Sequence, residues 1–348
     1  MMQMGGAPSV AIVAAFYFLE EQGAAASLYM VAVCVLVRSF PSRLVGVITG
    51  VVSVAFGLSG ILWQEVAYVF FGFKDPEKND DTNLFGLFVF MLTAVDICGV
   101  ALLCLAPHVP ATTDTGTADD DTSEDEYAVA RSLGTLASEG TTLKQTLVSI
   151  EFAFLIGLYS VVSSQIISMS AYLSSIQSAF SSMDAVIFDK LPFIANVAGR
   201  VFYAAMVSLL IRRHGASGVM IGSIWIHACF VVCFLVLALS ALAGNGSAYV
   251  LYGVFFLGYS AYGGGVCFAS SYTKLNFKES YIGIVVGLLF TLAAVANAVF
   301  TGFFPPENNL GSPDEVRTAS DFVRPWSAGL VTAIACVPLT LTAASRAM

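Results

Sequence analysis

The residues best suited to bind a charged solute lie between positions 189 and 200, inside a long apolar stretch. Asp189, Asn196 and Arg200 are seven and four residues apart, so a helix would place them on nearly one face. Pro192 can kink that helix and free backbone carbonyls. A guanidinium binds a carboxylate through two parallel hydrogen bonds, which favours an anion site with Arg200 as its fixed charge. The alternative is an ion pair of Arg200 with Asp189 or with an acid on a neighbouring helix.

Three carboxylates inside other apolar stretches are candidates for proton coupling: Glu20, Glu21 and Asp96. An apolar medium favours the protonated form of a carboxyl, so such a group can load and release a proton in each cycle. Adjacent helical residues point about 100° apart, so only one of Glu20 and Glu21 is expected to face a cavity. Alternatively, the first helix is shorter than its apolar stretch and both acids lie at the membrane interface.

Glycines recur in two apolar stretches at spacings that create small-residue surfaces. Such surfaces let membrane helices approach closely, so close packing is the expected role. Bending of the helices during a conformational change is compatible with the same pattern. Tyr259 and Tyr262, beside the second group, could line a cavity or pack against neighbours. The glycines are Gly46, Gly50, Gly57 and Gly60 in the first stretch and Gly258 and Gly263 in the second.

The composition defines the medium in which these residues lie. The chain is 57% hydrophobic and 11% charged, with a mean hydropathy of +0.81, whereas soluble domains carry about 25% charged residues. A helical span needs about 20 apolar residues, and the lack of strict alternation argues against barrel strands. We therefore expect an all-α polytopic membrane protein with about nine spans. The expected spans are 9–37, 43–72, 84–106, 146–171, 184–211, 217–243, 248–273, 280–303 and 325–345.

An acidic segment, 107–145, separates the first three spans from the other six. It contains eight acidic and two basic residues and few large apolar ones, which predicts a disordered linker. The expected organisation is a partial N-terminal bundle of three spans in 1–106, this linker, and a six-helix C-terminal bundle in 146–348.

The basic residues of the short loops predict the orientation in the membrane. They gather on one side if the spans alternate, and that side is expected to be cytoplasmic. The linker and the C-terminus would then be cytoplasmic and the N-terminus non-cytoplasmic. A cleaved signal peptide fits poorly, because no Lys or Arg precedes the first stretch and Glu20 and Glu21 interrupt it. The residues on the expected cytoplasmic side include Arg38, Arg43, Arg212, Arg213, Lys274, Lys278 and Arg346.

Several classes of function find no support in the sequence. The sequence has no stripe of basic residues, so nucleic acid is not expected as a partner. All seven cysteines fall in predicted spans without CxxC spacing, so we interpret them as packing residues and expect no cofactor. Cys229 and Cys233 with His227 could suggest a metal, but they lie in a uniformly apolar helix. No hydrolase elbow, zinc-protease motif, paired catalytic aspartates or nucleotide-binding loop is present, so we do not expect an enzyme.

Three segments share their order and spacing with one family of membrane transporters. Together they resemble the major facilitator superfamily, in particular its nodulin-like, monocarboxylate-transporter-related branch. The nine spans would then correspond to helices four to twelve of a twelve-helix fold, with the first three missing. Leu209 departs from the family, which often has an acidic residue there, and a leucine cannot form a loop-gating salt bridge. The segments are Arg38 to Gln64; Asn196, Gly199 and Arg200 through Arg212, Arg213, His214 and Gly215; and Gly258 through Gly265 to Phe277, Tyr281 and Gly283.

This resemblance implies a secondary active transporter that moves a small solute by alternating access, in the plasma membrane or an organelle membrane. The solute would be a small organic anion held by Arg200, Asn196 and Lys190, with a proton or counter-solute coupled to it. Arg38, Arg43, Arg212 and Arg213 would belong to the gating loops. The alternatives are a metal (iron) transporter of the same fold and a truncated membrane protein that does not transport.

Overall fold

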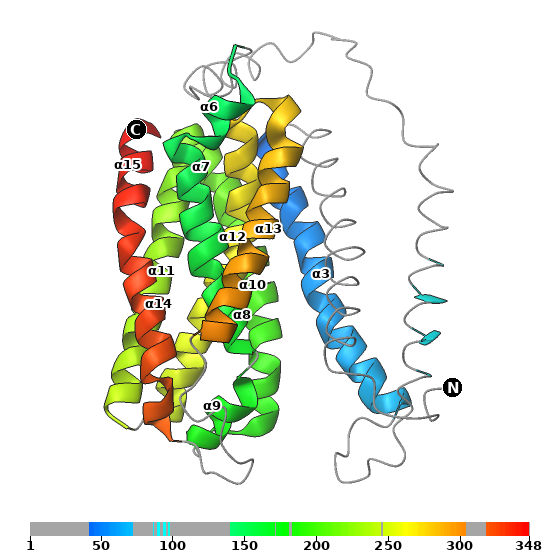
Figure 1. Ribbon diagram of the computed structural model, residues 1–348. Helices are drawn as coiled ribbons and strands as arrows, with labels where there is room; N and C mark the ends of the chain where they lie inside the picture. Colours follow the sequence, from blue (N-terminus) through cyan, green and yellow to red (C-terminus); the bar gives the residue numbers. More distant parts are fainter. Residues whose placement is uncertain are drawn as a thin grey trace, which may run out of the picture.

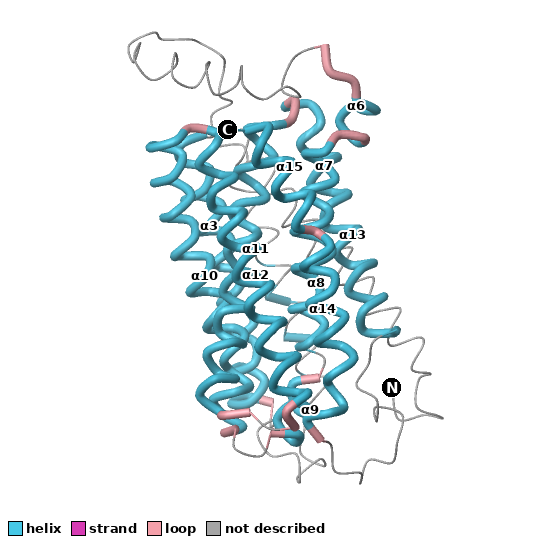
Figure 2. Tube along the Cα trace, turned by 90° about the vertical axis from the view of Figure 1, so that its left-hand side faces the viewer, coloured by secondary structure: helices cyan, strands magenta, loops and turns pink. Residues whose placement is uncertain are grey.

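The computed structural model describes residues 42–71, six positions between 86 and 97, and most of 140–303 and 318–347. Gaps within these ranges fall at 171, 181–182 and 245. All regular elements in the described part are helical (Figures 1 and 2), as expected for an all-α membrane protein. The predicted span 9–37, Glu20, Glu21, Arg38, Asp96 and linker residues 107–139 lie outside the described residues.

The described helices run almost continuously through the second half of the chain. One long helix, α3 (Ser42–Phe70), precedes the linker. The others are α6 (Leu143–Leu147), α7 (Ile150–Leu155), η4 (Ile156–Val162), α8 (Ser163–Ser170), α9 (Leu173–Ala179), α10 (Ala185–His214), α11 (Ala216–Leu242), α12 (Ala248–Asn276), η5 (Glu279–Tyr281), α13 (Ile282–Phe303), η6 (Ala319–Phe322), α14 (Val323–Ala335) and α15 (Val337–Ala347).

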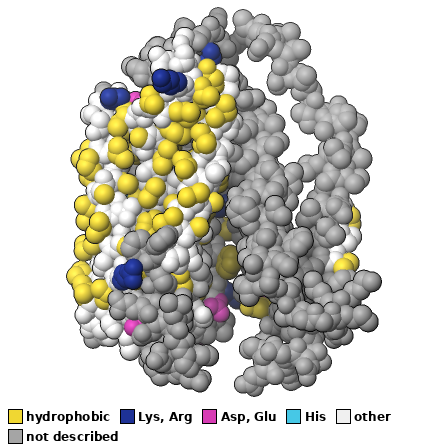
Figure 3. Space-filling model, viewed as in Figure 1, with side chains coloured by type: hydrophobic (Ala, Val, Ile, Leu, Met, Phe, Trp, Pro, Cys, Tyr) yellow, Lys and Arg dark blue, Asp and Glu magenta, His cyan; other side chains and the backbone are white. Residues whose placement is uncertain are grey.

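Six segments of the described chain are long and apolar enough to cross a membrane, so the protein is a multi-pass membrane protein. They lie within a few residues of the six spans predicted after the linker. Hydrophobic side chains cover the face of the bundle in Figure 3, and the Lys and Arg visible there lie near its two ends. The segments are Ile150–Ser170, Ile187–His214, Ser217–Leu242, Ala248–Asn276, Ile282–Gly302 and Ala319–Arg346.

The last span differs from the single helix predicted over 325–345. It is divided into α14 and α15 by a turn at Cys336. The backbone N–H of Cys336 donates to the carbonyl of Thr332 at 3.1 Å. Pro338 follows two residues later and has no N–H to donate to the carbonyl of Ile334, which weakens the helix at this point.

The first span after the linker changes its helical type. Seven residues, η4, form a π-helical segment between α7 and α8. Ser163 Oγ donates to the carbonyl of Leu158, five residues earlier, at 3.0 Å. The fully buried Ser160 hydroxyl donates to the carbonyl of Leu289 in α13 at 2.7 Å, so η4 is also tied to another span. Such π segments within α-helices frequently occur at functional sites.

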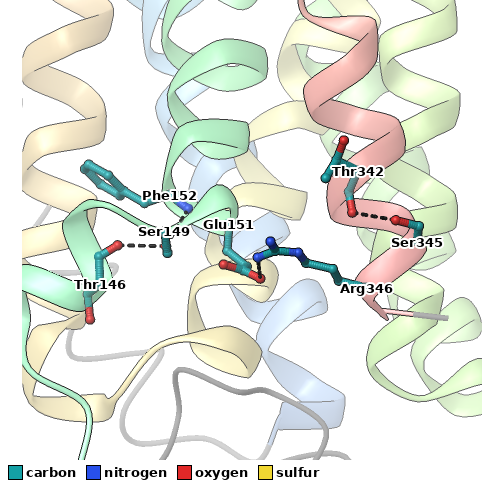
Figure 4. Close-up of polar contacts among 7 residues, drawn as sticks. All are labelled: Thr146, Ser149, Glu151, Phe152, Thr342, Ser345 and Arg346. Atoms are coloured by element: carbon teal, nitrogen blue, oxygen red, sulfur yellow. Dashed lines mark hydrogen bonds and ion pairs between the residues drawn. The ribbon is translucent and has the colours of Figure 1, made fainter.

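The two ends of the bundle can be named from what they hold. Figure 1 shows α6 and the C-terminus at one end, here the linker end, and α9 at the other, here the α9 end. At the linker end, the predicted linker overlaps α6, whose start is capped by Thr142 and Gln145. Figure 4 shows Ser149 capping α7 beside an ion pair of Glu151 with Arg346 at 3.7 Å. This ion pair connects the C-terminal helix, α15, to the first span after the linker.

The interior at the α9 end is an aromatic cluster centred on Trp326. Its ring stacks on Phe322 and Phe180, with centroids 5.1 and 5.8 Å apart, and meets the edge of Phe255 at 6.4 Å. Trp326 is 1% exposed. The cluster joins α14 to α9 and α12, and burial of such large rings is a main source of packing energy.

Candidate functional site

Arg200 is the charged residue buried deepest in a described span. Its exposed fraction is 2%, and it lies near the middle of the membrane-spanning part of α10, Ile187–His214. Its Nε donates to Oδ1 of Asn196, one turn earlier, at 2.8 Å. A charged residue at the centre of a membrane helix costs about 2.5–3.5 kcal/mol on insertion scales. Such a cost marks Arg200 as a candidate for binding a solute.

Asp189 does not pair with Arg200. It is exposed, and eleven residues along one helix correspond to about 16 Å, beyond the reach of the two side chains. The predicted face shared by Asp189, Asn196 and Arg200 therefore brings only the last two together.

Helix α12 packs directly against the Arg200 region. Gly199 and Gly263 make this approach possible, because a Cβ on Gly199 would overlap the Ser260 carbonyl and one on Gly263 would overlap the carbonyl of Asn196. Cys267 Sγ lies 3.7 Å from the carbonyl oxygen of Arg200. The backbone around Arg200 is thus enclosed by α12 on one side.

Helix α3 covers another side of the same region. A Cβ on Gly50 would overlap Cβ of Ala204 and would lie 3.5 Å from the carbonyl oxygen of Arg200. Arg200 therefore lies where α3, which precedes the linker, meets α10 and α12, which follow it. Gly46, Gly57 and Gly60 also belong to α3, but their surroundings are outside the described part.

Lys190, predicted as a second anchor for an anion, is engaged elsewhere in this structure. Its Nζ donates to Oε1 of Glu65 in α3 at 2.9 Å. The two side chains are 44% and 45% exposed. Ten helical residues place Lys190 about 15 Å along α10 from Arg200. Sequence reasoning did not include Glu65 in the site, and a partner 125 residues away leaves no local signal.

The other predicted site residues are dispersed. Tyr259 is 4% exposed, and its hydroxyl lies 2.9 Å from Ser170 Oγ in α8, inside the C-terminal helices. Tyr262 is partly buried against the hydrophobic core. Arg212 and Arg213 are exposed in the last turn of α10, and Arg43 lies in the first turn of α3 without a described side chain. A Cβ on Gly258 would lie 2.8 Å from Cys233 Sγ, so this glycine permits contact with α11.

His227 has a structural environment. Its Nδ1 lies 2.7 Å from Thr340 Oγ1 and its Nε2 lies 2.8 Å from the carbonyl oxygen of Ala333. It thus connects α11 to α14 and α15. Among the residues that the structure describes, no group of three or more His, Cys, Asp or Glu is placed to hold a metal ion.

A separate cavity lies toward the α9 end of the C-terminal helices. The space between its walls is about 370 Å³, including the part open to the surface, and its lining is mostly aromatic and aliphatic. Gln165 is 3% exposed, and neither its amide nitrogen nor its amide oxygen has a hydrogen-bond partner. Tyr172 donates to the carbonyl of Thr301 at 2.7 Å, and partial burial raises the pKa of its phenol. Sequence reasoning did not include any of these residues.

Comparison with known proteins adds no assignment, since no protein-family model, curated protein or solved structure matches this chain.

Proposed function

We propose that this protein is a secondary active transporter that moves a small organic anion across a membrane by alternating access. The observation that carries the proposal is the burial of Arg200 near the middle of a membrane-spanning helix. Ionisable residues at this depth usually face a solute pathway or a water-filled cavity. The guanidinium is held by Asn196, so its direction is fixed before a solute arrives.

The position of Arg200 between helices from the two parts of the chain supports the same proposal. In secondary transporters, solute sites lie near the bilayer midplane between two bundles, and one bundle moves against the other around the site. Here α3 comes from before the linker, and α10 and α12 come from after it. A small carboxylate bound there would accept two parallel hydrogen bonds from the guanidinium of Arg200.

We further propose the resemblance to the nodulin-like branch of the major facilitator superfamily as the family context, with coupling to a proton or to a counter-solute. Glu20, Glu21 and Asp96 remain the proposed proton carriers. No observation in the described helices favours the metal-transport alternative over the anion.

The test is uptake into liposomes that contain the purified full chain, with a panel of radiolabelled monocarboxylates. Arg200→Gln should reduce uptake at least about 100-fold, since a buried charge-assisted pair is worth several kcal/mol. Arg200→Lys should restore part of it, because the charge returns without the planar fork. Arg324→Gln, which changes an exposed arginine at the start of α14, is the control and should transport normally. Normal uptake by Arg200→Gln would refute the anion site.

A further inference from the structure

Two contacts between α3 and α10, which pack against each other, lie one on each side of Arg200. Toward the linker end, Gly50 faces Ala204 in direct contact. Toward the α9 end, Glu65 and Lys190 form their ion pair at 2.9 Å. The two contacts are 15 residues apart in α3 and 14 apart in α10, as expected for antiparallel helices lying side by side (Figure 2). Between them, Arg200 is 2% exposed.

The ion pair between Glu65 and Lys190 is too exposed to contribute much to the stability of the fold. Nearly half of each side chain is accessible, and ion pairs of this kind contribute little to stability. The flexible stem of Lys190 can turn away without disturbing the helix, and two of its three N–H donors are not used by Glu65. A contact that forms and breaks readily can shift a balance between two conformations, whereas the tight glycine contact cannot separate without moving the backbone.

We infer that Glu65 and Lys190 form a gate that closes the path to Arg200 from the α9 end. The inference rests on the proposed function and adds the group that controls access to its site. While the pair is intact, α3 lies against α10 and the path is closed. When the pair opens, the ends of the two helices separate and water and solute reach the middle of the membrane.

Position 197 reports on this path. Lys190, Val197 and Ala204 are seven residues apart, so Val197 lies on the face of α10 that both contacts turn toward α3. A cysteine at this position would react with a membrane-impermeant methanethiosulfonate applied at the α9 end only when the gate is open. Mass spectrometry of the peptide that contains residue 197 measures the reaction without removal of the native cysteines.

The experiment compares Val197→Cys alone with the same chain carrying Glu65→Gln, Lys190→Gln or the exchange of both charges, Glu65→Lys with Lys190→Glu. Each single substitution should accelerate labelling about two- to five-fold, the range set by the modest strength of an exposed pair. The exchanged pair should return the rate to that of the parent. Asp189→Asn, which removes an exposed acid beside Lys190, is the matched control and should leave the rate unchanged.

Equal labelling in the parent and both single variants would overturn the gate. Faster labelling of the buried Cys229 together with position 197 would also overturn the gate, because it would show that the substitution loosens the packing of the whole bundle. Each single variant neutralises a different member of the pair, Glu65 or Lys190. If one variant misfolds, the other still provides the test. Labelling needs no transported solute, and failure of the gate is therefore distinguishable from failure of the uptake assay.

Discussion

Gly199 of α10 lies so close to Ser260 of α12 that a Cβ on the glycine would overlap the serine carbonyl. Gly263 has the same relation to Asn196, four residues before Arg200. These contacts place backbone against backbone beside the buried arginine. The proposed site is therefore held by the closest helix packing in its surroundings, and it is sensitive to a single added methyl group.

Gly263→Ala should lower the free energy of unfolding by about 1–3 kcal/mol, because overpacking of a close contact has a cost of this size. Gly253→Ala, in the same helix, has nothing within 4 Å of the added Cβ and serves as its control. The control should be neutral or stabilised by up to about 1 kcal/mol from helix propensity. Thermal unfolding in detergent measures both, and equal stability of the two variants would contradict the close contact.

Gln165→Leu should raise the free energy of unfolding by about 1–3 kcal/mol, because it removes a buried amide that has no hydrogen-bond partner. Gln177→Leu, in the partly exposed α9, should change stability by less than about 0.5 kcal/mol. Thermal unfolding again provides the comparison. A less stable Gln165→Leu protein would show that the amide is satisfied in solution.

Thr340→Val should lower the free energy of unfolding by about 1–3 kcal/mol, because it leaves a buried ring nitrogen unpaired. The Ala333 carbonyl can only accept, so His227 Nε2 donates to it. Nδ1 then accepts from the Thr340 hydroxyl at 2.7 Å, a shorter contact than the 3.3 Å between that hydroxyl and the Cys336 carbonyl. Thr332→Val is the control, since that hydroxyl bonds within its own helix to Ala328 at 2.7 Å. A control as destabilised as Thr340→Val would remove the role assigned to His227.

Arg346→Gln should lower the free energy of unfolding by about 1–2 kcal/mol, between the values for exposed and buried ion pairs. Glu151 is 9% exposed and would remain as a buried carboxylate without its ion-pair partner. Glu151→Gln should cost less, because an amide carries no charge into the interior. Thermal unfolding at low and high salt, with Arg213→Gln for comparison, tests whether the loss of stability is electrostatic. A loss of stability in Arg346→Gln that does not change with salt would contradict this explanation.

Most helices after residue 140 could be predicted because each apolar stretch ends at polar residues. The predicted span 184–211 is found as Ala185–His214, longer by the basic residues Arg212, Arg213 and His214. Basic side chains are favourable in the last turn of a helix, so they extend it where hydropathy ends it. The break at Cys336 had a signal in Pro338, whereas the sequence of η4, IGLYSVV, contains no feature that distinguishes a π-helix from an α-helix.

The candidate site could be predicted only where the contact is local. A separation of four residues was sufficient to bring Asn196 and Arg200 together on α10. The partner of Lys190 is Glu65, and the cover of Arg200 comes from Gly50 and Gly263. These pairs join distant parts of the chain, and no periodicity within one helix contains that information.

The π-helical segment η4 has a mechanical consequence for the span that contains it. A π-helical turn accommodates one more residue than an α-helical turn, so conversion of η4 to an α-helix would rotate α8 by about 100° and shift it by about 1.5 Å. Gln165 would then turn to a different neighbour, and its solitary amide would gain a new environment. The register of α8 is therefore adjustable by one residue while α7, on the other side of η4, stays in place.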